Sequence, residues 1–194
     1  MGIVVFQGVE ELDFVGPLEV FANWTGGKER LSAFTVGLAD PTGLVKCEGD
    51  LLVRPHHTLG DAPPIDILVV PGGPGRREAM NSEPLTNFVA ENGSGALFTL
   101  SVCTGAFIVA RAGLLRGRRT TTYVDGKQDK ELAATGLVGE VLRDVRYVVD
   151  GPVVSAGGIS AGIDGALEVV ARLYGRAAGR ELAGILNYHW MEAA

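Results

Sequence analysis

The stretch Ala-Leu-Phe-Thr-Leu-Ser-Val-Cys-Thr-Gly-Ala-Phe-Ile-Val-Ala, residues 96–110, joins a strand pattern to a helix pattern through one cysteine. The apolar run over 96–102 predicts a strand buried in a sheet, and residues 104–115 predict the helix that follows. Cys103 stands at the junction, where the small pair Thr104-Gly105 opens the helix. This order is that of a nucleophile elbow, although the spacing differs from the G-x-S-x-G of hydrolases.

Cys103 is therefore a candidate nucleophile. The N-terminal end of a helix favours the thiolate, because the helix dipole stabilises a negative charge there. Gly105 would allow another segment of backbone to approach the turn closely. A free cysteine is also commonly a small, buried apolar side chain, and the spacing alone leaves both interpretations open.

The rest of the chain alternates short apolar runs with helical stretches, which predicts a mostly parallel sheet with helices on both faces. The strands expected are 3–6, 32–38, 52–55, 65–70, 96–102, 120–123, 145–149 and 153–156, the last two forming a hairpin around Asp150-Gly151. The helices expected are one with Pro17 in its first turn, 76–92 with a break or restart at Pro84, 104–115, 125–135, 158–174 and 176–190.

Composition sets limits on the class of protein. The chain has 194 residues, a net charge of -6, 46% hydrophobic residues and 21% charged residues. These values predict a single globular domain over 1–194. We expect no DNA-binding domain, because a helix-turn-helix has no room after Trp190. An acidic chain has no electrostatic basis for binding nucleic acid or an anionic membrane. The apolar runs are too short to span a bilayer and no signal peptide is recognisable, so we expect a cytoplasmic protein.

Two other turns follow predicted strands, and open α/β sheets place their ligands at the carboxyl ends of strands. Gly72 and Gly73 are expected to direct backbone N–H groups at an oxyanion beside the cysteine. Glu10, Glu11 and Asp13 follow the first strand, where alternation points Glu11 and Asp13 one way and Glu10 the other. One of these carboxylates is a candidate proton donor or acceptor for Cys103. A plain loop and a solvated acidic segment are the alternatives for these two turns.

No cofactor site is recognisable. His56 and His57 lie in a proline-rich segment expected to be a solvated loop, without the cysteine or carboxylate spacing of a metal site. His189 lies next to Trp190, and Cys47 receives no role. The glycines follow neither the Rossmann nor the P-loop pattern. We therefore expect neither a metal nor an organic cofactor.

Taken together, these segments resemble the ThiJ/PfpI superfamily, which is related to class I glutamine amidotransferases. The S-V-C-T-G and L-D-x-x-G-P forms resemble its isonitrile hydratase branch in particular. The segments that carry the resemblance are Glu-Leu-Asp-Phe-Val-Gly-Pro (11–17), Pro-Gly-Gly-Pro-Gly (71–75), Ser-Val-Cys-Thr-Gly (101–105), Ala-Gly-Leu-Leu-Arg-Gly-Arg-Arg (112–119) and Ser-Ala-Gly-Gly-Ile-Ser-Ala-Gly-Ile-Asp (155–164).

The resemblance implies a flavodoxin-like three-layer sandwich and a homodimer that acts on a small electrophilic substrate. It implies that Cys103 is the nucleophile and Asp13 its acidic partner. Thr104 matches the threonine that follows the nucleophile in isonitrile hydratases. Gly73 matches the glycine whose amide helps to form the oxyanion pocket.

Tyr123 departs from the family pattern, because many relatives have a histidine there. A Cys–His dyad from that segment is therefore excluded, which argues against the protease-like members. The leading hypothesis is hydration of an isonitrile to an N-substituted formamide. The alternatives are a glyoxalase, deglycase or amidohydrolase that uses the same cysteine, and a redox or ligand sensor that is not an enzyme.

Overall fold

The computed structural model describes residues 1–25, 31–38, 40 and 42–192. In this part of the chain, seven strands form one sheet in the order β10-β11-β7-β6-β1-β2-β5. Neighbouring strands run parallel except for β10 and β11, which form the antiparallel hairpin at one edge. The strands are β1 (Gly2–Phe6), β2 (Phe34–Leu38), β5 (His57–Thr58), β6 (Ile67–Val70), β7 (Phe98–Val102), β10 (Tyr147–Asp150) and β11 (Val153–Ala156).

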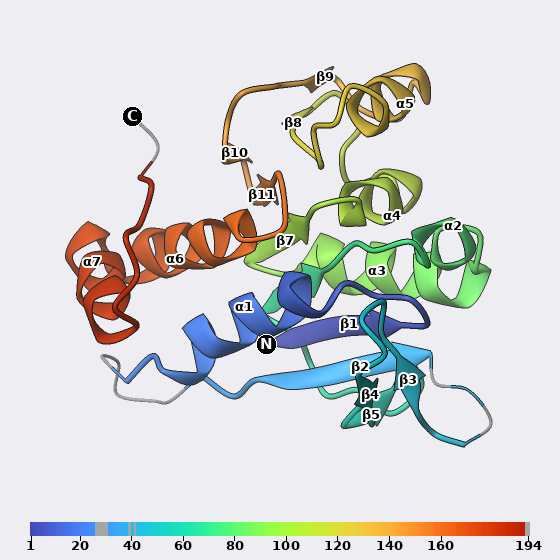
Figure 1. Cartoon of the computed structure of the whole chain (residues 1–194), viewed down its shortest axis with the longest axis horizontal. Helices are drawn as coiled ribbons and strands as arrows, with labels where there is room; N and C mark the ends of the chain where they lie inside the picture. The colour runs from blue at the N-terminus through green and yellow to red at the C-terminus, as the bar shows by residue number, and fades with distance from the viewer. Residues whose placement is uncertain (26–30, 39, 41, 193–194) are drawn as a thin grey trace.

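Helices cover both faces of the sheet, as the alternation of patterns predicts (Figure 1). Successive strand residues face opposite sides, and in β7 Thr99 lies against α3 while Leu100 lies against α6. Because both faces are covered, β1 and β6 are buried along their whole lengths. The helices are α1 (Glu11–Ala22), α2 (Arg76–Ala79), α3 (Glu83–Gly95), α4 (Gly105–Arg111), α5 (Gln128–Ala134), α6 (Ala161–Tyr174) and α7 (Arg176–Ile185).

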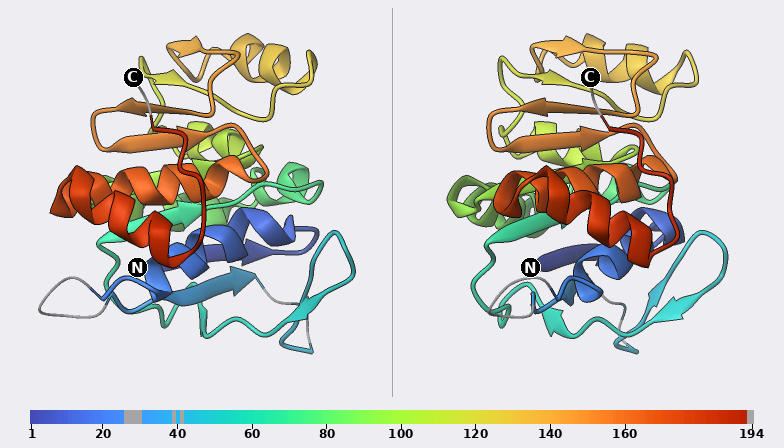
Figure 2. Two further views of the ribbon diagram at one scale, coloured as in Figure 1. Left: turned by 60° about the vertical axis from the view of Figure 1, so that its left-hand side comes forward. Right: turned by 90° about the vertical axis from the view of Figure 1, so that its left-hand side faces the viewer.

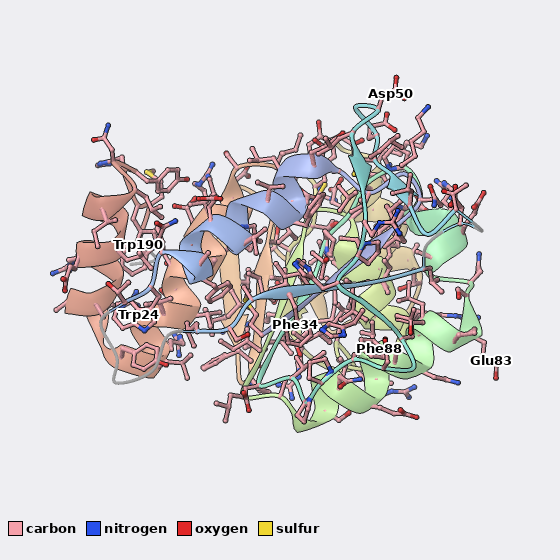
Figure 3. All side chains as sticks on the ribbon, turned by 90° about the horizontal axis from the view of Figure 1, so that it is seen from below. Trp24, Phe34, Asp50, Glu83, Phe88 and Trp190 are labelled. Atoms are coloured by element: carbon pink, nitrogen blue, oxygen red, sulfur yellow. The ribbon has the colours of Figure 1, made fainter. Side chains whose placement is uncertain are left out.

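The two faces differ in their helices. Helices α1 and α6 pack against each other on one face, and α7 packs on α6, as both views of Figure 2 show. Helices α3 and α4 contact each other and β6, and α2 packs on α4. Trp24 and Trp190 lie at the same end of the molecule, beyond the ends of α1 and α7 (Figure 3).

Two short ribbons complete the described chain. One pairs β3 (Val45–Lys46) with β4 (Leu52–Val53), and its turn carries Asp50 away from the body of the molecule (Figure 3). The other pairs β8 (Arg119–Thr120) with β9 (Glu140–Val141) in parallel, next to α5 (Figure 1).

Several local expectations are wrong. The helix expected over 176–190 ends at Ile185. Helix α1 begins at Glu11, so Pro17 lies inside the helix and not in its first turn. The strand expected over 120–123 is only the short β8, because the threonines that follow use their hydroxyls to bond neighbouring segments. His57 belongs to β5, which pairs with β2, and is therefore part of the sheet edge and not a solvated loop.

Candidate active site

The three turns identified in the sequence meet at one edge of the sheet. They follow β1, β6 and β7, which are adjacent and parallel, so their carboxyl ends lie side by side. A cavity of about 640 Å³ opens over this edge and contains Cys103 at its surface. The described residues that line it are Glu10, Gly73, Pro74, Arg76, Arg77, Cys103, Thr104, Tyr123, Lys127, Gln128 and Ile159.

Cys103 has the backbone conformation of an elbow. Its φ is 55°, in the left-handed region that costs a non-glycine residue roughly 1–2 kcal/mol. Two hydrogen bonds hold the residue there. The Cys103 N–H donates to the carbonyl of Ala156 at 2.9 Å, and the Thr122 hydroxyl donates to the Cys103 carbonyl at 2.9 Å. The neighbouring strand and the threonine run thus compensate for the strain and fix the direction of the thiol.

Gly105 is required by the same turn. A Cβ atom at this position would lie 2.1 Å from the Val70 carbonyl oxygen, a distance that no side chain can adopt without moving the backbone. The absence of a side chain therefore lets the first turn of α4 approach the end of β6. The expectation of a close backbone approach at Gly105 is confirmed.

Asp13 is the carboxylate that the fold brings to the cysteine. It lies in the first turn of α1, is fully buried, and accepts the Gly72 N–H at 3.0 Å through Oδ2. Glu11 lies two residues earlier and accepts the N–H of Gly49 at 2.7 Å instead. Because this segment is helical, the two acids do not share a direction as they would in an extended strand.

The environments of Asp13 and Cys103 set their protonation. Burial, with a smaller contribution from the charge of Glu10, raises the pKa of Asp13 to about 7 despite the bond from Gly72. Burial also raises the pKa of Cys103, and the charge of Asp13 raises it further. The backbone N–H and hydroxyl of Thr104 act in the opposite direction and lower the pKa of the thiol. Asp13 and Cys103 therefore titrate as a coupled pair that holds one negative charge above neutral pH.

The expected oxyanion donors are partly occupied. The Gly72 N–H bonds Asp13, so this amide positions the acid and is not directed into the cavity. The Gly73 N–H donates to the Thr104 hydroxyl oxygen at 3.1 Å. Gly73 and Thr104 both line the cavity beside Cys103, so an oxyanion role for the Gly73 amide stays a prediction.

Several residues of the site were not identified from the sequence. Arg76 is almost fully buried, stacks 3.7 Å above the Phe107 ring, and donates to Gln128 and to Glu131. Burial lowers its pKa, while the charges of Glu131 and Cys103 oppose that change. The position of Arg76 directly after Pro-Gly-Gly-Pro-Gly was the available signal. For Thr122, the signal was the threonine run that precedes Tyr123.

Tyr123 lines the cavity with a side chain that is 42% exposed. The histidines lie elsewhere: His56 accepts the Thr35 N–H at 3.1 Å and His57 packs edge-on against Phe34. None of the described residues that line the cavity is a histidine.

Within the described ranges, no group of three or more histidine, cysteine or acidic side chains is arranged to hold a metal ion. No helix among the described residues is long and apolar enough to cross a membrane.

The fold and the elbow define a class of flavodoxin-like α/β proteins that carry a cysteine at the carboxyl edge of the sheet. A model of the DJ-1/PfpI family matches residues 2–172, and the chain belongs to that family. An isonitrile hydratase of Pseudomonas putida is 34% identical over 176 residues, which cover 90% of this chain and 72% of that protein. Protein DJ-1 homolog A of Arabidopsis thaliana is 28% identical over 95% of this chain and 45% of its own length.

Solved structures agree with the family assignment. A ThiJ/PfpI family protein from Pseudomonas syringae superposes with a TM-score of 0.83 at 26% identity, over all of this chain and 76% of its own. A DJ-1 superfamily protein from Salmonella typhimurium, solved as a cysteine-to-alanine mutant, gives a TM-score of 0.81 at 25% identity and covers 97% of this chain. The flavodoxin-like architecture expected from the resemblance is confirmed.

Proposed function

We propose that this protein is a cysteine-dependent isonitrile hydratase-like enzyme. The observation that carries the proposal is the buried Asp13 carboxyl beside the Cys103 thiol. Cys103 lines the cavity, and none of the described lining residues is a histidine. An isonitrile needs a nucleophile for its terminal carbon and a proton for that same carbon. A thiolate next to a carboxylic acid supplies both from one side of the substrate. The 34% identity with an isonitrile hydratase supports the same activity.

The proposed first step uses the pair in its one-charge form. The Asp13 carboxylate first takes the proton of the Cys103 thiol. The resulting thiolate attacks the terminal carbon of R–N≡C, and Asp13 transfers the proton to that carbon. The product is a covalent thioimidate, R–N=CH–S–Cys103, and Asp13 becomes a carboxylate. A pKa of about 7 suits this transfer, since the acid neither holds nor releases its proton strongly at neutral pH.

The second step adds water. The Asp13 carboxylate takes a proton from water as the hydroxyl bonds to carbon, and it passes that proton to the imine nitrogen. Asp13 then takes the hydroxyl proton as the C=O bond forms and the C–S bond breaks. The sum is R–N≡C plus H₂O to R–NH–CHO, with the thiolate and the protonated Asp13 restored. In this scheme Thr104 and the Gly73 amide stabilise the charge that develops beside Cys103.

Incubation of the purified protein with cyclohexyl isocyanide, followed by NMR detection of the formamide, tests the proposal. The C103A variant is the matched control, because it removes only the thiol. Formamide formed by the wild type and not by C103A supports the activity; no product above the C103A level contradicts it. Methylglyoxal consumption with formation of lactate would instead favour the glyoxalase alternative.

We further propose a homodimer. Leu12, Leu51 and Leu52 are exposed, and they flank the contact between α1 and the β3–β4 turn that Glu11 and Gly49 form. A second copy would remove this apolar surface from water. Light scattering of wild type and L52D tests this, since a mass of one chain for the wild type contradicts it. Cys47 and Cys103 are both free thiols, which supports our proposal of a cytoplasmic protein. We also propose a single domain over 1–194, because one sheet takes strands from β1 through β11.

A further inference from the structure

One wall of the cavity is cationic. Arg76 and Arg77 line it from α2, and Lys127 lines it from the residue that precedes α5. Among the described lining residues, Glu10 is the single acid, and it lies on the turn before α1. The chain as a whole has a net charge of -6, so the charge of this wall is opposite to that of the average surface. A local field of this kind concentrates anions at a cleft.

The ion pairs in the wall leave positive charge in excess. Arg76 and Arg77 both bond one carboxylate, that of Glu131, at 3.0 and 3.3 Å. One acid cannot neutralise two guanidinium groups. Arg76 is buried and donates hydrogen bonds to Gln128 and Glu131, so it stabilises the contact between α2 and α5. Arg77 donates to Glu131 at 3.3 Å through each of its two terminal nitrogens, but its side chain is 61% exposed and its remaining N–H groups can bind a ligand.

Lys127 adds a second available charge. Its neighbour Asp125 directs Oδ1 at the backbone N–H groups of Lys127 and Gln128, at 2.9 and 2.7 Å. Across the part of the chain that the structure describes, the Lys127 ammonium makes no ion pair within 4.0 Å. An exposed, unpaired ammonium at the rim of a cavity binds an anion without first breaking an internal pair.

We propose that this wall is a carboxylate subsite and that the substrate is a small electrophile with a carboxylate group. Lys127 and Arg77 bind the carboxylate, while the electrophilic carbon lies at the Cys103 sulfur. A monoanion is favoured over a phosphate dianion, because Glu10 and the single charge of the Cys103–Asp13 pair oppose a higher negative charge. That the electrophile is an isonitrile rests on the proposed function; the preference for a carboxylate does not.

Alkylation of Cys103 tests the subsite without any assumption about the reaction. Iodoacetate and iodoacetamide differ in charge and little in size, and peptide mass spectrometry separates Cys103 from Cys47. We expect the iodoacetate-to-iodoacetamide rate ratio to fall about three- to tenfold in K127Q and in R77Q. The control is K130Q, which removes an exposed lysine three residues further along, in α5 and outside the cavity lining. An unchanged ratio in both variants, or an equal fall in K130Q, overturns the subsite.

Turnover then separates the two proposals. With the subsite, an isocyano-carboxylate has a KM about tenfold below that of its methyl ester, and K127Q removes the difference. Equal KM values for acid and ester, with formamide formed from both, contradict the carboxylate subsite and still support the proposed hydratase activity. If no isonitrile reacts but the iodoacetate-to-iodoacetamide ratio still falls in K127Q, the proposed hydratase activity is contradicted and the carboxylate subsite is supported.

Discussion

The Asp13 carboxylate accepts the Gly72 N–H at 3.0 Å, a bond that ties the first turn of α1 to the turn after β6. The second oxygen, Oδ1, is buried and forms no hydrogen bond of good geometry within the described residues. Burial therefore outweighs the Gly72 bond and the smaller opposing effect of the Cys103 thiol, and the pKa of Asp13 rises to about 7. The carboxyl group is an acid poised near neutral pH, beside a thiol whose pKa its charge raises.

The raised pKa of Asp13 makes stability depend on pH. Its ordinary pKa is 3.8, so between that pH and about 7 the unfolded chain releases the proton while the folded chain keeps it. The free energy of unfolding should therefore fall as pH rises through this window, by on the order of 4 kcal/mol from this group. Urea unfolding from pH 4 to pH 8 measures the fall. The D13N variant should lack this component, and an identical pH slope in both proteins contradicts the assignment.

The same coupling sets the pH dependence of activity. The reactive form carries one negative charge on the Asp13–Cys103 pair, so kcat/KM for an isonitrile should rise through pH 7 and then level off. In D13N the thiol is the remaining acid, and burial raises its pKa, so the rising limb should move to higher pH. The rate below that limb should fall about 10²–10⁴-fold without the proton donor. A limb that stays at pH 7 in D13N contradicts this account.

Thr104 should act through its hydroxyl. That oxygen accepts the Gly73 N–H and lowers the pKa of Cys103. T104V should therefore raise the thiol pKa and leave the Gly73 N–H without this acceptor. We expect roughly tenfold slower turnover, the equivalent of about 1.4 kcal/mol. T104S keeps the hydroxyl and should restore most of the rate. Equal rates for T104V and wild type would show that the hydroxyl has no part in the chemistry.

Thr122 should hold the strained elbow. Its buried hydroxyl donates to the Cys103 carbonyl at 2.9 Å, and T122V would leave that carbonyl without this donor. The expected cost is about 1–3 kcal/mol of unfolding free energy, together with a lower kcat because the thiol direction is less restricted. T122S serves as the control in denaturant unfolding and kinetics. A loss of stability with kcat intact would limit Thr122 to a structural role.

Tyr123 should contribute its ring and not a proton. It lines the cavity and is 42% exposed. Y123F should keep kcat within about twofold, while Y123A should raise KM severalfold by removing apolar surface from the pocket. A pH-dependent loss of kcat in Y123F would instead make the hydroxyl part of the proton transfer.

The strands nearest the site could be predicted because their signals are local. Apolar runs such as 65–70 and 96–102 have one stable location, inside a sheet covered on both faces. The start of α1 could not be predicted in the same way. Glu11 to Pro17 has no periodic apolar pattern of its own, and contact with α6 and the sheet stabilises it as a helix. Pro17 was therefore placed too early in the helix.

The sequence by itself determined that Cys103 ends a buried strand and opens a helix, because both patterns are encoded by neighbouring residues. Without the family resemblance, it left Asp13 and Glu11 as alternatives for the acidic partner. Only the tertiary structure decided between them, since the helical start of α1 directs Asp13 to Gly72 and Glu11 to Gly49. The wall of Arg76, Arg77 and Lys127 also required the fold. The two arginines and Lys127 lie about 50 positions apart in the sequence, so their charges add at one wall only after the chain has folded.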